Sequence, residues 1–163
     1  MMRAYALVRP FPSVEEYFMK SKVINEGPER TIALVFDEGE EVTAGLLRFA
    51  EEQNLTAARF TGIGALSHAV LGFFDLEKRD YQRIEIAEQV EVLSLIGNFA
   101  LQGAKKKIHA HIVLGKSDGT AHGGHLLEGH VRPTLEVLVV ESPGWLQREV
   151  DEKTGLPLLN PTA

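Results

Sequence analysis

Residues 107–131 read KIHAHIVLGKSDGTAHGGHLLEGHV and hold five of the six histidines of the chain. The part IHAHIVL alternates between two residue classes with a period of two, which is typical of a β-strand with one buried face. His109 and His111 are two positions apart, so we expect their side chains to project from the same face of this strand. The opposite face is expected to be apolar and to consist of Ile108, Ala110, Ile112 and Leu114.

The rest of this segment supplies a third histidine. Asp118-Gly119 is typical of a hairpin turn after the strand. Gly123 and Gly124 permit backbone angles closed to other residues, so we expect them to form a turn that brings His125 back toward His109 and His111. Two imidazoles on a strand and one from a nearby loop commonly bind a transition metal. The sequence therefore predicts a site for a divalent transition metal, zinc or another, on these three histidines.

The other histidines are weaker candidates. The alternative for the paired histidines is a polar strand face that is solvated or paired with acids. His122 could replace His125 as third ligand, although it precedes the two glycines, and His130 is a weaker candidate still. His68 is expected to be structural or to lie at an interface. Because the ligands must be neutral imidazoles, metal affinity is expected to fall below about pH 6.5.

Hydrophobic patterning predicts one main helix and a run of strands. Ser13–Glu16 resembles a capping box for a short helix toward Val23, and residues 40–53 have the apolar stripe of an amphipathic helix. Residues 31–36 are continuously apolar, which predicts a strand buried on both faces. Further strands are expected at 57–64, 67–75, 82–87, 91–99, 107–115 and 134–141, with a bend or bulge at Gly62 and Gly64 between the first two. This pattern favours an α+β fold in which one helix packs on a sheet.

Composition fits an ordinary globular protein of one domain. The chain has 163 residues, of which 44% are hydrophobic and 25% charged. It has no cysteine, which excludes disulfides and thiolate metal ligands and fits a cytoplasmic location. The first residues do not resemble a signal peptide, and no apolar run approaches the roughly 20 residues of a membrane span, so no membrane association is expected.

The charge balance argues against a dedicated nucleic-acid binder. Acidic residues number 23 and basic residues 17, for a net charge of −6. The one basic cluster, Lys105–Lys107, lies between two predicted strands and is interpreted as a solvated turn. A specific DNA-binding protein makes many phosphate contacts through Lys and Arg. We therefore expect no tight binding to duplex DNA.

Several short motifs follow one another along the chain: GEEV (39–42), GIGALS (62–67), VEVLSLIGN (90–98), HAH (109–111), GGHL (123–126) and TLEV (134–137). Their order resembles the plants-and-prokaryotes conserved domain, also called the PPC or PCC domain. The resemblance covers about residues 30 to 141, and WLQREVDEKTG (145–155) is similar to the end of bacterial members.

The resemblance implies a mixed, mostly antiparallel sheet flanked by one helix and assembled as a homotrimer. It also implies a metal ion, usually taken as zinc, on the positions that are His109, His111 and His125 here. Plant members add a basic AT-hook built on Arg-Gly-Arg-Pro, which this sequence lacks. Three segments follow: a lead-in (1–28), a PPC-like domain (29–142) and a tail (143–163) that is expected to wrap the surface with Trp145 as its anchor.

Three functions are compatible with these features. The first is a trimeric metal-binding domain that acts as a sensor or binds a small ligand. The second is a zinc-dependent hydrolase or lyase, because three histidines leave one position open and an open zinc lowers the pKa of its bound water to about 7. Glu91 is then the candidate for the general base, or for a carboxylate that orients an imidazole. The third is a DNA-associated regulator.

Overall fold

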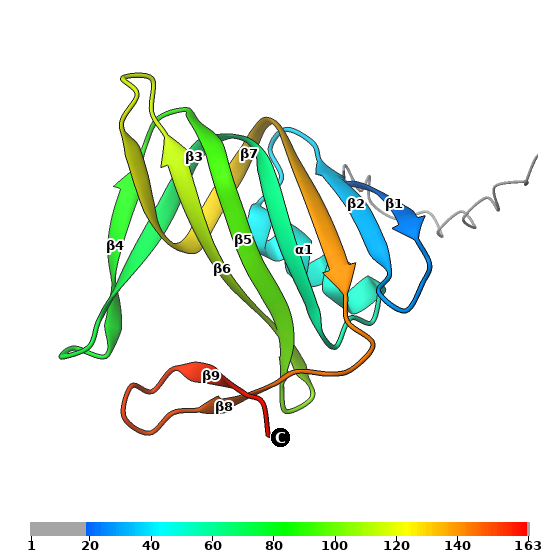
Figure 1. Cartoon of the computed structure of the whole chain (residues 1–163). Coiled ribbons are helices and arrows are strands. Elements are labelled where there is room, and N and C mark those ends of the chain that lie inside the picture. Colours follow the sequence, from blue (N-terminus) through cyan, green and yellow to red (C-terminus); the bar gives the residue numbers. More distant parts are fainter. Residues whose placement is uncertain (1–18, 163) are drawn as a thin grey trace, which may run out of the picture.

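The computed structural model of the chain describes residues 19–162, and Figure 1 shows their arrangement. Within this part the structure has one helix and nine strands. Their bounds are β1 Lys20–Asn25, β2 Thr31–Phe36, α1 Val42–Glu52, β3 Ala58–Asp75, β4 Asp80–Ile86, β5 Val90–Gln102, β6 Lys105–Gly115, β7 Ala121–Glu141, β8 Gln147–Val150 and β9 Pro157–Asn160. The predicted α+β class, with a mostly antiparallel sheet and one flanking helix, is confirmed.

Four long strands form a closed circuit of antiparallel pairs. β3 pairs with β5, β5 with β6, β6 with β7, and β7 again with β3. β2 and then β1 extend the sheet from β7, and β4 pairs with β3. A closed circuit leaves few unpaired edges, which favours a rigid frame for side chains on its surface.

The helix α1 covers one face of the sheet, as Figure 1 shows. Glu41 caps its first turn by accepting hydrogen bonds from the backbone amides of Thr43 and Ala44. The helix ends before Asn54, whose φ of 52° lies in the left-handed region. The buried face of the helix consists of Val42, Gly45, Leu46, Phe49 and Ala50.

β2 is buried on one face only, so the prediction of burial on both faces is wrong. Ile32, Leu34 and Phe36 are buried, while the residues between them are partly exposed. Phe36 packs toward α1, because a Cβ at Gly45 would meet its ring. The helix covers one side of the strand and leaves the other side open.

Three further expectations differ from the structure. Residues 20–25 form β1, which pairs with β2, so no helix reaches Val23; residues 13–18 lie outside the described part. The strands predicted at 57–64 and 67–75 are one strand, β3, and the bulge is confirmed as a register shift between Gly62 and Gly64. β7 begins at Ala121 rather than near 134, because it continues the hairpin from β6.

The tail is anchored by an arginine and not by the tryptophan. Trp145 is 67% exposed, whereas Arg148 on β8 is 5% exposed. Arg148 donates hydrogen bonds to Asn98 Oδ1 on β5 (2.5 Å) and to the carbonyl oxygen of Pro157 on β9 (2.9 Å). In residues 19–162, no helix is long and apolar enough to cross a membrane.

Candidate metal centre

Two neighbouring strands of the circuit, β6 and β7, bring the three predicted histidines together. His109 and His111 project from the outer face of β6, while Ala110, Ile112 and Leu114 between and after them are buried. His125 lies on β7 directly across from His111 in the strand register. The ring centroids are 5.1 Å apart for His109 and His111, 5.2 Å for His109 and His125, and 5.5 Å for His111 and His125.

Strand pairing, rather than a turn, places His125. Gly123 and Gly124 are residues of β7, so the prediction of a Gly-Gly turn is wrong. The chain reverses instead at Asp118-Gly119, as predicted, where Gly119 has φ 82°. The glycines allow close approach between strands, since a Cβ at Gly124 would lie 3.0 Å from the carbonyl oxygen of Gly72.

The nitrogen positions suit a small metal ion. His109 Nε2 and His111 Nε2 are 3.2 Å apart, and one ligand atom from each of the three histidines lies within 4.8 Å of the others. Nitrogens bound to a tetrahedral zinc at roughly 2.0–2.1 Å are about 3.3 Å apart. The pair on β6 therefore already has the spacing of two ligands, and the ligand atom of His125 lies within 4.8 Å of both.

Burial keeps two of these imidazoles neutral. The pKa of His125 is lowered to about 4, first by burial and then by the charges of His109, His111 and Arg148. The pKa of His109 is also lowered, first by burial and then by Arg148 and His111. Neutral imidazole is the form that binds metals. Protons are thus expected to compete with a metal for these two histidines only at a lower pH than for a solvated histidine.

One ring nitrogen in the cluster lacks a partner. Within the described residues, Nδ1 of His125 is buried and makes no hydrogen bond, although Tyr81 stacks on the ring at a centroid distance of 4.8 Å. A buried polar atom without a partner is unfavourable, so a metal ion bound through this nitrogen would satisfy it. With three imidazoles and no thiolate, the donor set fits zinc or a neighbouring divalent ion.

A cavity of about 300 Å³ opens beside two of the histidines. Its lining consists of Ile96, Gly97, Asn98, His109 and His111. The Asn98 side chain is held by Arg148 from the tail, so a buried positive charge lies behind the cavity. Sequence reasoning missed Arg148, because one arginine in an irregular tail carries no periodic signal.

The remaining candidates lie outside this cluster. On β5, Ile96 pairs with His111, whereas Glu91 lies five residues away and pairs with Gly115. At about 3.4 Å per residue this separation is about 17 Å, so Glu91 does not reach the three histidines of its own chain. His122 is exposed and belongs to neither group of clustered histidines, whereas His130 lies in a second group with His68.

The lowered pKa of His125 predicts a pH-dependent stability of the metal-free protein. The folded state has a pKa of about 4 against an ordinary value of 6.5, so between these values the unfolded chain binds more protons. The free energy of unfolding is therefore expected to be greatest above about pH 6.5 and to fall as the pH drops toward 4. Urea unfolding of the metal-free protein at pH 7 and pH 5 measures this difference. His125→Gln should reduce it, and an unchanged difference in that variant would contradict the assignment.

Comparisons with known proteins identify the family of this chain. The family model described as the Plants and Prokaryotes Conserved (PCC) domain matches residues 24–143. A protein from Archaeoglobus fulgidus described as metal-containing is 35% identical, with a TM-score of 0.75, over 90% of this chain and 99% of the other. A plant- and prokaryote-conserved (PPC) protein from Pyrococcus horikoshii is 32% identical, with a TM-score of 0.77, over 86% of this chain and 99% of the other.

A curated relative is much longer than this chain. The bifunctional protein GlmU of Synechococcus sp. is 29% identical over 157 residues, which make up 94% of this chain and 24% of that protein. This chain thus spans about a quarter of the length of that relative. The family model covers most of the chain and includes all three clustered histidines. The chain belongs to the Plants and Prokaryotes Conserved (PCC) domain family.

Proposed function

We propose that this protein binds one divalent transition metal, zinc, on His109, His111 and His125 and uses the open coordination position to bind a small ligand. The observation that carries the proposal is the convergence of three imidazoles from β6 and β7, with their ligand atoms within 4.8 Å of one another. The description of the Archaeoglobus fulgidus relative as metal-containing supports it. The domain would then act as a sensor, in which the presence or absence of the ligand on the metal is the signal.

Charge near the cavity favours an anionic ligand. The metal would place positive charge on one side of the cavity. The buried Arg148, which is hydrogen-bonded to the lining residue Asn98, places a second positive charge behind that residue. A small carboxylate placed at the open position would interact favourably with both charges. We therefore propose a small organic acid as the ligand class.

Cobalt substitution tests the open position. Co²⁺ on three imidazoles is expected to give visible absorption bands that change when acetate or azide is added, because the anion enters the fourth position. Arg148→Gln should weaken the response to acetate while cobalt binding persists. A spectrum that stays constant at saturating anion would contradict an open position on the metal.

A zinc-dependent hydrolase or lyase is the second candidate. It shares the three-histidine site but also needs a general base within hydrogen-bond reach of the reacting group. Glu91, the carboxylate expected for that role, lies about 17 Å away along β5, so it cannot act as the base at the histidines of its own chain. Ligand binding is the proposal that needs no such residue.

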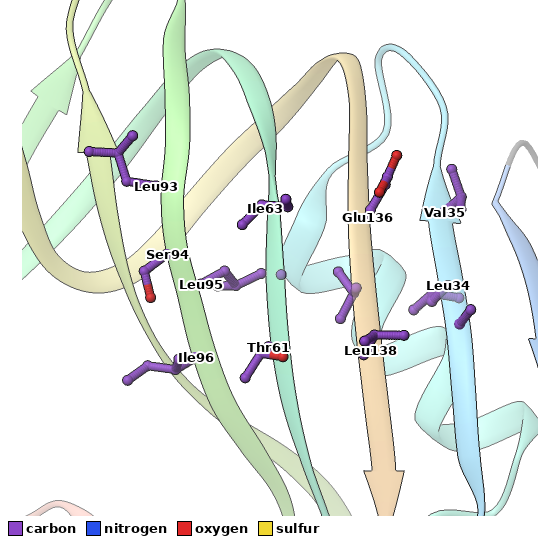
Figure 2. Close-up of a pocket in the computed structure, with 13 residues that line it drawn as sticks. Leu34, Val35, Thr61, Ile63, Leu93, Ser94, Leu95, Ile96, Glu136 and Leu138 are labelled. Carbon is purple, nitrogen blue, oxygen red and sulfur yellow. The ribbon is translucent and has the colours of Figure 1, made fainter. Parts of the chain in front are cut away.

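We also propose that the protein assembles as a homotrimer through the sheet face that α1 leaves open. Figure 2 shows this face, where a cavity of about 410 Å³ is lined mainly by apolar side chains of β2, β3, β5 and β7. Ile63, Leu93, Ile96 and Leu138 each expose about half of their surface or more. Such a contiguous apolar patch is typical of a protein interface. Ile96 also lines the cavity beside the histidines, so the interface would adjoin the metal site.

Replacing Leu93 by glutamate is expected to dissociate the trimer, because the charge would be buried in an apolar contact. Light scattering should give about 54 kDa for the wild type, three times the chain mass of 18.0 kDa, and about 18 kDa for the variant. Leu76→Glu is the matched control, since Leu76 is exposed outside the patch. A wild-type mass of one chain at micromolar concentration would refute the proposal.

A further inference from the structure

A second group of ligand-type side chains lies on the same sheet, away from the three histidines. His68 on β3 faces His130 on β7 in the strand register, and their rings stack with a centroid distance of 4.4 Å and an interplanar angle of 14°. Glu128 on β7 completes the group, and its Oε1 lies 3.0 Å from His130 Nε2. One ligand atom from each of the three lies within 4.8 Å of the others, as for the first cluster.

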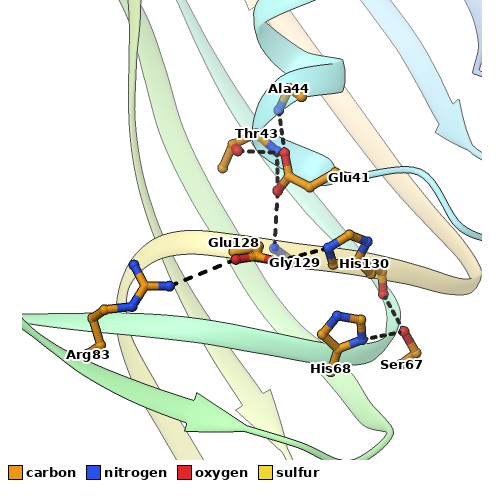
Figure 3. Close-up of polar contacts among 9 residues, drawn as sticks. All are labelled: Glu41, Thr43, Ala44, Ser67, His68, Arg83, Glu128, Gly129 and His130. Atoms are coloured by element: carbon orange, nitrogen blue, oxygen red, sulfur yellow. Dashed lines mark hydrogen bonds and ion pairs between the residues drawn. The ribbon is translucent and has the colours of Figure 1, made fainter.

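The orientation of each side chain is fixed by a neighbour, as Figure 3 shows. Ser67 Oγ lies 2.9 Å from His68 Nδ1, which leaves Nε2 of that ring available. Arg83 on β4 is 3.9 Å from Glu128 Oε2, so the other carboxylate oxygen faces His130. Metal-ligating histidines usually have their second nitrogen held in this way, and the contact to Ser67 provides it for His68.

The backbone under this group is tied to the start of α1. Glu41 accepts a hydrogen bond from the amide of Gly129 (3.1 Å) in addition to those from the first turn of the helix. The amide of Val131 donates to the carbonyl oxygen of Glu40 (2.9 Å). These bonds hold residues 128–130 in place without a bound ion. The negative charge of the Glu41 carboxylate also counters the partial positive charge at the start of α1, which would otherwise repel a cation bound nearby.

We propose that His68, Glu128 and His130 form a second site for a divalent transition metal, weaker than the first, which clamps β3 to β7. Two imidazoles and a carboxylate are ligands that suit zinc, cobalt and nickel. The 3.0 Å between Glu128 Oε1 and His130 Nε2 is close to the separation of adjacent ligands around such an ion, about 3.0–3.4 Å for bonds of roughly 2.0–2.2 Å. The metal would take the place of the hydrogen bond between these two atoms.

The role of a clamp follows from where the group lies in the sheet. The β3–β7 ladder changes register between Gly64 and Leu66 and again between Leu66 and His68. An irregular ladder has fewer continuous hydrogen bonds, so a metal bridge between His68 and His130 would connect the two strands where their pairing is interrupted. A metal that binds only the folded state also stabilises that state. The group is also separate from the first cluster, because the partners of His130 and His125 on β3 are four residues, about 13 Å, apart.

Zinc titration of the full chain in a His109→Ala/His111→Ala background isolates the second site. One zinc equivalent per chain is expected to bind, and it should raise the thermal unfolding midpoint in this background. Adding His68→Ala should weaken this binding at least about 10-fold and remove the rise in midpoint, because the clamp loses one ligand. His68 is exposed, so its replacement leaves the core intact.

His122→Ala in the same background is the matched control, since His122 is exposed and outside both clusters, and it should change neither result. Glu128→Gln, which keeps a hydrogen-bond acceptor beside His130, should also weaken zinc binding. If the background protein binds no zinc, or if His68→Ala leaves its affinity unchanged, the second site is overturned. Both outcomes are independent of the first cluster, which is already disabled in these variants.

Discussion

Replacing His125 by alanine is expected to weaken the tighter zinc equivalent more than about 100-fold. His125 is the ligand that β7 adds to the pair on β6, and its ring lies within 5.5 Å of both partners, centroid to centroid. Loss of residues that merely orient a ligand already weakens metal affinity 10–100-fold, so loss of the ligand itself should exceed that. A two-imidazole site exposed on a strand face would remain.

Competition with a chromophoric chelator measures this affinity. The wild type should show a tight step that is absent from His125→Ala, from His109→Ala and from His111→Ala. His122→Ala, three residues from His125 on the same strand, should keep the tight step because His122 is outside the cluster. A tight step of unchanged affinity in His125→Ala would show that another residue is the third ligand.

Replacing Gly97 by alanine is expected to destabilise the fold by about 1–3 kcal/mol and to weaken zinc binding as well. Gly97 on β5 lies between a core ring and the histidine strand. A Cβ there would be 2.5 Å from the carbonyl oxygen of His109 and would also meet the ring of Phe60. Phe60 is fully buried and packs on Phe99, so its ring has little room to move, and the backbone of β6 must shift as well.

Urea unfolding and the zinc titration together check this coupling. Gly144→Ala is the control, because no atom lies within 4 Å of a Cβ at that position. It should leave the midpoint of unfolding and the zinc affinity within error of the wild type. A Gly97→Ala protein that is destabilised but binds zinc normally would show that β6 can shift without moving the imidazole of His109.

Local patterns in the sequence predicted the parts of the site that depend on one element. The alternation around His109 and His111 placed both on the outer face of β6, and the structure confirms it. The Asp118-Gly119 turn and the apolar stripe of α1 were likewise local features. Period and turn chemistry act over a few residues, so they can be read without knowledge of the fold.

Features that depend on pairing between distant residues were not predictable in this way. Gly123 and Gly124 have the composition of a turn, but both are strand residues that pair with β6. Gly123 admits the backbone of β6 and Gly124 that of β3, which follows from the pairing of β7 with both strands. The position of Arg148 depends on contacts with Asn98, 50 residues away. The approach of His68 to His130 likewise spans 62 positions and depends on the same register.

A zinc-edge anomalous difference map from a crystal of the zinc-loaded protein tests the central claim most directly. We predict a peak at roughly 2.0–2.1 Å from one ring nitrogen each of His109, His111 and His125. A second, weaker peak between His68, Glu128 and His130 is compatible with this result and belongs to the second site. A map from fully loaded protein with no peak among His109, His111 and His125 would contradict the account.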